Sequence, residues 1–346
     1  MTPHFSGVQN EKGETIGDYK FFNKPFGLKH WMEHSDHFSL QQIDDIVILI
    51  DPDMILTRPI IGDFSNDVDT LIAKIRQPHI LGRRVEHGLP FAQTYGFGAQ
   101  WERLDLDAIA GPESPAKLVD KMTGRLHYAV GPPYLATVQD MYQIAIKWSE
   151  FVPLVHKQYP NLLAEMFAFS IAAAHLELKH QIIDSLMVSD AEINGGEGWP
   201  LVDKIPNEKT CSFAKNYAGD NEYVLPSVLH MCQRYSVGND WFFGKRRFPK
   251  DFFQCDHPLL EEPPDNLATA FNFKKPPNAP EPTELTPKFV NRESFMICYL
   301  TAVANEAATF FKRQACKSGS INLKKSLKMV QLFDNYKNGS QEEENN

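Results

Sequence analysis

The segment IVILIDPDMILTRPI, residues 46–60, places five aliphatic residues directly before two aspartates that a single proline separates. A short, continuous run of β-branched and aliphatic residues is typical of a strand that is covered on both faces of its sheet. We therefore expect residues 46–50 to form a buried strand, with Asp51 and Asp53 at its carboxyl end. Ligands of α/β sheets bind beyond this end of the strands, so the two aspartates mark the candidate site.

The spacing of the two aspartates predicts a cation site. In an extended segment, residues i and i+2 project to the same side, and Pro52 restrains Asp51 to an extended conformation. Two carboxylates this close repel each other unless a cation lies between them. Mn²⁺ or Mg²⁺ would remove the repulsion and keep coordination positions open for phosphate oxygens. The alternative is a simple turn whose carboxylates bind nearby backbone groups.

Two classes of enzyme place a pair of acids in this way. In nucleotide-sugar transferases with the GT-A fold, the pair holds a metal against the diphosphate of the donor. In haloacid-dehalogenase-like phosphatases, the first acid is the nucleophile and the second the general acid, roles that would fall to Asp51 and Asp53. The phosphatase motif continues with a small residue and then Thr or Val, whereas Met54 and Ile55 follow here. The match to the phosphatases is therefore partial.

A second candidate region, VLHMCQRYSVGNDWFFGKRRFP, covers residues 228–249. It places His230 at the end of a predicted strand, and a neutral imidazole is a good third ligand for a transition metal. The basic residues Lys245, Arg246 and Arg247 are suited to offset the charge of a departing diphosphate. The alternatives are a hydrogen-bonded core histidine and a solvated surface run.

Helical and strand patterns alternate along the chain, which predicts an α/β fold. A Pro-rich linker (263–288) and a C-terminal helical extension (289–336) follow the domain expected at 20–262, and the tail 337–346 is a solvated charge run. The expected helices are 23–37, 137–156, 161–178, 289–316 and 321–336, and the other expected strands are 181–188 and 223–230. We expect Asn23 to cap the first of these helices. We expect a capping box of Thr137 and Asp140 to begin the second.

Composition excludes some classes of function. A net charge of −9 argues against a general nucleic-acid binder. Residues 1–15 lack a basic start followed by an apolar run, so we expect no signal peptide or anchor in the sequence as given. The apolar run 295–311 is interrupted by Asn305 and Glu306, which predicts a packed helix. Among the five cysteines, Cys211, Cys232 and Cys255 predict one disulfide and one remaining thiol, which leaves the redox compartment open.

Five segments resemble, in the same order, those of plant and algal hydroxyproline O-arabinosyltransferases and peptidyl serine α-galactosyltransferases. The resemblance covers about residues 20–260 and does not separate the two activities. The segments are FNKPFGLKHWMEH, IVILIDPDMILTRPI, VGPPYLATVQDMYQIAIKWSEF, LLAEMFAFSIAAAH and VLHMCQRYSVGNDWFFGKRRFPKDFFQC.

The resemblance implies a metal-dependent glycosyltransferase with a GT-A-like fold. The enzyme would move arabinose or galactose from a UDP-sugar to hydroxyproline or serine hydroxyls of glycoproteins, with Mn²⁺ or Mg²⁺ as cofactor, in the Golgi or secretory pathway. By position, Asp51 and Asp53 are the metal motif, His230 is the late metal ligand, and Asn23 and Lys24 lie close to the donor. Lys245 and Arg246 would offset the charge of the UDP leaving group.

Glu165 is a candidate catalytic residue because it is the only acid in the apolar run 162–176. A buried charge without a partner is costly, so this carboxylate either orients the attacking hydroxyl or steadies a cationic sugar. The alternatives are a buried salt bridge and one solvent-facing position. The segment GPPY (131–134) predicts either a rigid wall of the acceptor groove or a turn.

The sequence departs from the family at its N-terminus. A GT-A domain normally places the strands that hold uracil and ribose before its D-x-D motif, and only 50 residues precede Asp51 here. We expect an incomplete chain that lacks part of the N-terminal nucleotide-binding half and the family's secretory anchor. The alternative is a glycosyltransferase-like binding protein without turnover.

Overall fold

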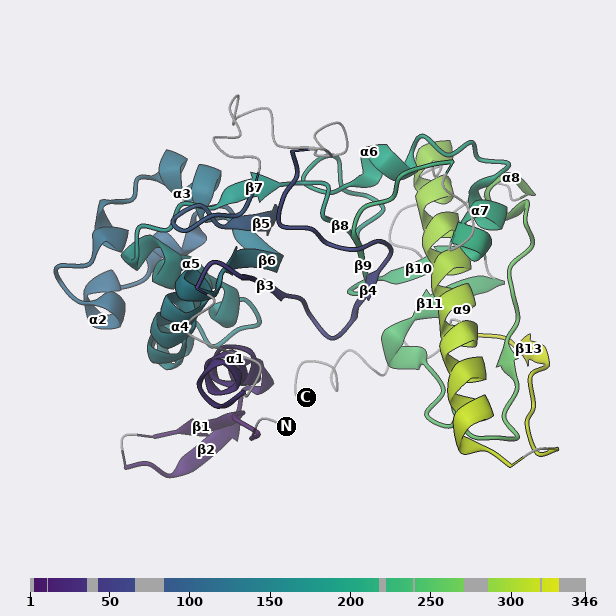
Figure 1. Cartoon of the computed structure of the whole chain (residues 1–346), viewed down its shortest axis with the longest axis horizontal. Coiled ribbons are helices and arrows are strands. Elements are labelled where there is room, and N and C mark those ends of the chain that lie inside the picture. Colours follow the sequence, from purple (N-terminus) through teal and green to yellow (C-terminus); the bar gives the residue numbers. More distant parts are fainter. Residues whose placement is uncertain are drawn as a thin grey trace. The chain divides into compact units, whose positions relative to one another are not determined.

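The computed structural model describes residues 3–10, 12–35, 43–65, 84–217, 222–238, 240–270, 286–317 and 319–329. The fold is mixed α/β, with several sheets and helices (Figure 1). The chain forms two compact units: unit 1 comprises Met1–Met187 and Asn194–Gly198, and unit 2 comprises Val188–Ile193 and Trp199–Asn346. This division falls inside the range 20–262, and the predicted domain limits stay predictions.

Unit 1 is built on a four-stranded sheet with the order β3-β6-β5-β7. β6 runs antiparallel to both of its neighbours, and β5 and β7 are parallel. The predicted strand 46–50 is confirmed as β3, but only Val47 in it is buried, because β3 lies at the edge of this sheet. The strands of unit 1 are β1 (Gly7–Gln9), β2 (Thr15–Asp18), β3 (Ile46–Leu49), β4 (Met54–Leu56), β5 (Phe91–Thr94), β6 (Val130–Thr137) and β7 (Gln181–Ile183).

The longest strand of this sheet is β6, and all eight of its residues are buried, as are all residues of β5 and β7. The prediction of a turn at GPPY is wrong, because Gly131–Tyr134 lies within β6. A glycine is required at position 131, since a Cβ atom there would lie 2.2 Å from the Tyr95 ring. The two prolines in this segment led to the prediction of a turn, because proline is rare inside sheets.

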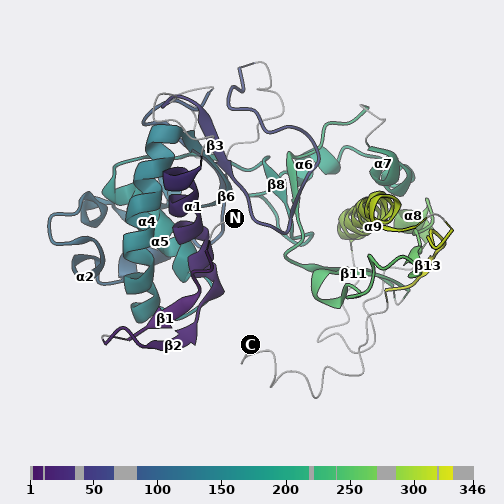
Figure 2. The same cartoon turned by 60° about the horizontal axis from the view of Figure 1, so that its bottom comes forward.

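Helices cover the sheet of unit 1, and α1 lies beside α4 (Figure 2). The buried helix predicted at 161–178 is confirmed as the shorter α5, in which eleven of twelve residues are buried. The helices of unit 1 are α1 (Asn23–His34), α2 (Leu106–Ala110), α3 (Lys121–His127), α4 (Val138–Gln158) and α5 (Ala164–His175), with 3₁₀ turns η1 (Lys20–Phe22), η3 (Gln100–Arg103) and η4 (Pro115–Leu118).

The two predicted helix caps have different outcomes. Thr137 caps α4, since its hydroxyl accepts a hydrogen bond from the backbone N–H of Asp140 at 3.3 Å. The Asp140 carboxylate does not complete the box: it accepts from His87 Nδ1 at 2.7 Å and from Gly88 N at 2.8 Å. The cap at Asn23 is wrong, because Asn23 is already the first residue of α1.

Unit 2 packs short elements against one long helix, α9. β10 and β11 form an antiparallel hairpin, and β12 and β13 are parallel. The elements are α6 (Trp199–Val202), α7 (Thr210–Asn216), β9 (Val228–His230), β10 (Arg234–Val237), β11 (Trp241–Gly244), η6 (Lys245–Arg247), β12 (Leu259–Leu260), α8 (Leu267–Ala270), α9 (Pro287–Ala315) and β13 (Lys325–Leu327); β8 (Met187–Val188) lies at the boundary of the units.

Several predicted ranges change in this part of the chain. The helix at 289–316 is confirmed as α9, and the strand at 223–230 is confirmed only over β9. The range 181–188 holds two short strands instead of one. The helix predicted at 321–336 is wrong over 321–329, where β13 lies, and 330–336 falls outside the described residues. Most of the linker 263–288 and the whole tail 337–346 also fall outside them.

α9 is long and apolar enough to cross a membrane by length and composition, which is weak evidence for a span. Within the most apolar stretch of 18 residues in α9, 56% is buried inside the protein. The helix also buries polar residues, among them Arg292, whose guanidinium binds the Asp203 carboxylate through Nε (2.8 Å) and Nη2 (2.7 Å).

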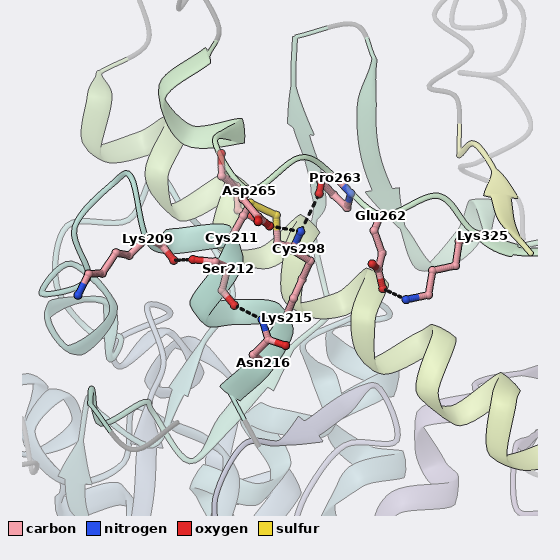
Figure 3. Close-up of polar contacts among 11 residues, drawn as sticks. Lys209, Cys211, Ser212, Lys215, Asn216, Glu262, Pro263, Asp265, Cys298 and Lys325 are labelled. Atoms are coloured by element: carbon pink, nitrogen blue, oxygen red, sulfur yellow. Dashed lines mark hydrogen bonds and ion pairs between the residues drawn. A yellow bond between two sulfur atoms is a disulfide. The ribbon is translucent and has the colours of Figure 1, made fainter. Parts of the chain in front are cut away.

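Two disulfides fasten α9 to the rest of unit 2, so the prediction of a single bridge is wrong. Cys211 on α7 bonds to Cys298 (Figure 3), and Cys255 bonds to Cys316 at the end of α9. Cys232 is exposed and forms neither bridge. The partners are 87 and 61 residues apart, so no local spacing revealed the pairs.

Lysines fasten neighbouring segments around the first bridge (Figure 3). Lys215 of α7 donates to the Pro263 carbonyl at 3.0 Å and pairs with Asp265. Lys325 of β13 pairs with Glu262.

Removing the Cys211–Cys298 bridge should destabilise unit 2. A cross-link that closes a long loop lowers the entropy of the unfolded chain, by about 2–5 kcal/mol in typical cases. We expect the Cys211→Ala/Cys298→Ala variant to unfold at lower urea than the parent, with the exposed Cys232→Ala as control. Coincident unfolding curves would contradict the prediction.

Glu293 should make the stability of unit 2 depend on pH. Burial raises the pKa of Glu293 to about 8, the Ser236 N–H opposes this, and the charges of Asp190 and Glu192 add to it. The unfolded carboxyl has a pKa of about 4.3, so between these values the folded chain binds more protons than the unfolded chain. Stability should therefore fall as the pH rises from about 4.3 to about 8.

Glu293→Gln keeps an oxygen for the Ser236 N–H, which lies 2.5 Å from the carboxylate, and cannot ionise. We expect this variant to be more stable than the parent at pH 9 and to lose most of the slope between pH 5 and 8. Urea unfolding across this range measures both effects. Glu306→Gln, at an exposed position of α9, is the control and should keep the slope.

Candidate functional site

Asp51 and Asp53 lie in a turn that follows β3. The Asp51 carbonyl accepts a hydrogen bond from Met54 N at 3.0 Å, so the expectation of an extended segment is wrong. The two side chains still converge, because carboxylate oxygens of Asp51 and Asp53 lie within 4.8 Å of each other. The turn therefore sets two acids side by side at the end of a strand, as the predicted cation site requires.

Lys24 joins Asp51 to Glu165. Its Nζ atom lies 2.7 Å from Asp51 Oδ1 and 3.2 Å from Glu165 Oε1. The side chains of Lys24 and Asp51 are 17% and 18% exposed, and that of Glu165 is 3% exposed. Three predicted site residues from the first turn of α1, the turn after β3 and the first turn of α5 thus form one cluster.

The charges of this cluster depend on one another. Burial raises the pKa of Glu165, the Lys24 ammonium opposes this rise, and Asp51 adds to it. For Lys24, burial lowers the pKa, but the attraction of Glu165 and Asp51 outweighs burial, so the pKa is raised. Lys24 therefore stays charged and reduces the repulsion between the two acids.

The backbone of Glu165 is held from two sides. Its N–H donates to the Tyr19 hydroxyl at 3.1 Å, and its carbonyl accepts from Trp148 Nε1 at 2.8 Å. The Tyr19 hydroxyl donates in turn to the Leu162 carbonyl at 3.1 Å. A solvent-facing Glu165 is therefore excluded, and the buried salt bridge is what the structure contains. Sequence patterns missed Tyr19 because its partners are more than 140 residues away.

Asn23 shapes the entry to α1 with its side chain. Its Oδ1 accepts from Phe5 N at 2.6 Å, and its Nδ2 donates to the Lys20 carbonyl at 2.9 Å. The amide thus ties the preceding segment to the turn that presents Lys24. Contact of Asn23 with a donor stays a prediction.

The remaining predicted site residues belong to unit 2. His230 is the last residue of β9 and is buried, and its carbonyl accepts from the Tyr235 hydroxyl at 3.1 Å. Lys245 and Arg246 lie in η6 and are exposed. The prediction that His230 joins the two aspartates, and that the basic residues face the donor, stays a prediction.

Comparison with known proteins gives one distant match. A peptidyl serine alpha-galactosyltransferase from Arabidopsis thaliana is 27% identical over 274 residues, which are 76% of this chain and 27% of that protein. The chain thus spans about a quarter of the length of this relative. The match supports a relation to a glycosyltransferase family. No family model matches the chain, and no solved structure matches it.

Lys24→Met should destabilise unit 1, because it removes the counter-charge of the buried Glu165 and of the partly exposed Asp51. Breaking a buried ion pair by removing one partner costs about 3–5 kcal/mol. We expect Lys24→Met/Glu165→Gln to recover part of this loss, since the second change removes one of the orphaned acids. Urea unfolding measures both variants.

The matched control is Lys29→Met on the same helix, where the Lys29–Glu33 pair is partly exposed and 4.0 Å long. A change of this kind alters stability by at most about 1 kcal/mol. Equal effects of Lys24→Met and Lys29→Met would contradict the assigned role of Lys24.

Proposed function

We propose that this chain is a metal-dependent glycosyltransferase with a GT-A-like fold, which moves a sugar from a UDP-sugar to a hydroxyl group of a protein. The observation that carries the proposal is the match to a peptidyl serine alpha-galactosyltransferase over 76% of the chain. The acceptor would be serine or hydroxyproline, and the sugar galactose or arabinose. The cluster at Asp51 supplies residues for such a reaction.

The pair Asp51 and Asp53 fits a divalent cation. Its oxygens lie within 4.8 Å of each other, and one of these acids is already paired with an ammonium ion. Hard cations such as Mn²⁺ or Mg²⁺ prefer carboxylate oxygens. We propose His230 as the further ligand. The bound ion would supply positive charge beside the diphosphate of the donor.

Basic residues would bind the phosphates of the donor. We propose that Lys24, which pairs with Asp51, binds a phosphate oxygen once the diphosphate competes with the carboxylates for its ammonium group. Asn23 would act by holding the turn that carries Lys24. Lys245 and Arg246 are exposed in unit 2 and are proposed to offset the charge of the departing UDP.

Glu165 is proposed as the catalytic carboxylate. The acceptor oxygen forms a bond to the anomeric carbon, the bond from this carbon to the phosphate oxygen breaks, and UDP leaves with the electron pair. Glu165 would orient the acceptor hydroxyl and take up its proton. Burial raises the pKa of Glu165, which makes it a better base than an exposed carboxylate.

The two disulfides support a role in the secretory pathway, of which the Golgi is the compartment we propose. Bridges of this kind form and persist in oxidising compartments and are rare in the cytosol. Both Cys211 and Cys298 are fully buried.

Binding of Mn²⁺ and UDP tests the proposal. We expect calorimetry to detect UDP binding that requires Mn²⁺, and Asp51→Asn and Asp53→Asn to weaken Mn²⁺ binding at least about tenfold, because each removes a charged ligand. Asp45→Asn, at the exposed position directly before β3, should match the parent. Transfer is then measured with UDP-galactose and UDP-arabinose on peptides that contain serine or hydroxyproline.

Three results would overturn the proposal. The first is a parent protein that does not bind Mn²⁺, together with Asp51→Asn and Asp53→Asn variants that behave in the same way as the parent. Release of phosphate from a simple phosphate ester, lost in Asp51→Asn, would favour a phosphatase. Peptide binding without any nucleotide binding would favour a binding protein without turnover.

A further inference from the structure

The hydroxyl group of Tyr134 is buried beside the Lys24–Asp51–Glu165 cluster without a hydrogen-bond partner. Tyr134 is completely buried on β6, and its hydroxyl oxygen has no partner among the residues that the structure describes. A hydroxyl group removed from water without a partner costs free energy. A phenylalanine would fill the same space without this cost, so the hydroxyl needs an explanation.

The ring of Tyr134 is held firmly on the helix side of the sheet. It stacks on Phe169 of α5, with ring centroids 3.8 Å apart, and lies edge-on to Trp148 of α4. Phe169 is one helical turn after Glu165, so both project from the same face of α5. The aromatic packing therefore fixes the ring beside the carboxylate and leaves the hydroxyl little freedom.

The strand pairing places Tyr134 near Asp51 as well. Tyr134 lies opposite Leu49 of β3, two residues before Asp51. Burial raises the pKa of Tyr134, and the negative charges of Glu165 and Asp51 raise it further, so the hydroxyl keeps its proton. Lys24 forms ion pairs with both acids of the cluster, and the hydroxyl of Tyr134 donates to neither.

We propose that Tyr134 is a positioning residue whose hydroxyl donates a hydrogen bond to the Glu165 carboxylate when donor phosphates draw the Lys24 ammonium away. The inference rests on the proposed function, in which Lys24 binds the diphosphate. Glu165 would then lose its counter-ion while it stays buried, and a charged carboxylate in that position needs a donor. Tyr134 supplies the donor from a rigid strand, which keeps Glu165 oriented toward the acceptor hydroxyl.

Tyr134→Phe tests this role, because it removes only the hydroxyl. Without ligands, the variant should melt at the same temperature as the parent or about 2–4 °C higher, since an unsatisfied polar group is lost. In the transfer assay, kcat should fall about 10–100-fold. The affinity for UDP with Mn²⁺ should also fall, by about tenfold, because the hydrogen bond from Tyr134 forms only in the donor-bound state and so stabilises it.

A double-variant cycle separates a role through Glu165 from a general structural role. If Tyr134 acts through Glu165, Tyr134→Phe should cause no further loss of kcat in the Glu165→Gln protein. The control is Tyr128→Phe, another buried tyrosine of unit 1, whose ring lies edge-on to Trp101 and whose pKa responds to Glu177 rather than to the cluster. It should leave kcat unchanged.

Each outcome decides the inference. Parental kcat in Tyr134→Phe, an undiminished effect in the Glu165→Gln protein, or a clearly lower melting temperature would overturn it. If the parent transfers sugar and Tyr134→Phe does so equally well, the inference alone fails. If the parent neither transfers sugar nor binds UDP with Mn²⁺, the proposed function fails and the inference fails with it.

Discussion

The ammonium group of Lys24 is the interaction on which the site of unit 1 depends. It forms ion pairs with Asp51 and Glu165, two acids that lie 27 and 141 positions after it in the chain. The buried Glu165 carboxylate has a raised pKa, and the Lys24 ammonium opposes this rise and favours its charged form. The same ion pairs connect α1, the turn after β3 and α5, so they contribute both to the packing of unit 1 and to the charge state of its site.

This arrangement limits how the site can work. A ligand that binds at Asp51 must displace the ammonium of Lys24 or add to it, and any displacement leaves Glu165 in need of another partner. The hydroxyl of Tyr134, which has no partner in the ligand-free structure, is the group that we propose as this other partner. Such a site gives up some stability in its ligand-free state, which is common where polar groups serve function. In unit 2, by contrast, the contacts described here are structural: two disulfides and the Arg292–Asp203 pair hold its long helix α9 in place.

Local patterns predicted the elements whose signal lies within a few residues. The aliphatic run before Asp51 is a strand, the apolar run around Glu165 is a buried helix, and Thr137 caps the helix that follows it. The patterns failed where distant contacts decide. The strand containing Tyr134 reads as a turn because of its prolines, and the disulfide partners have no local spacing. The match to a galactosyltransferase relates the chain to a glycosyltransferase family but assigns no role to any of these side chains.

The sequence by itself determined that two acids follow an apolar strand and that a single acid, Glu165, interrupts an apolar helix. These features depend on neighbouring residues, and periodicity and the cost of burying charge are enough to read them. Only the tertiary structure decided that Lys24 lies between Asp51 and Glu165, and that the Tyr134 hydroxyl lies beside them without a partner. The physical reason is that ion pairing acts over a few ångströms in space, and chain folding alone determines which distant residues come that close.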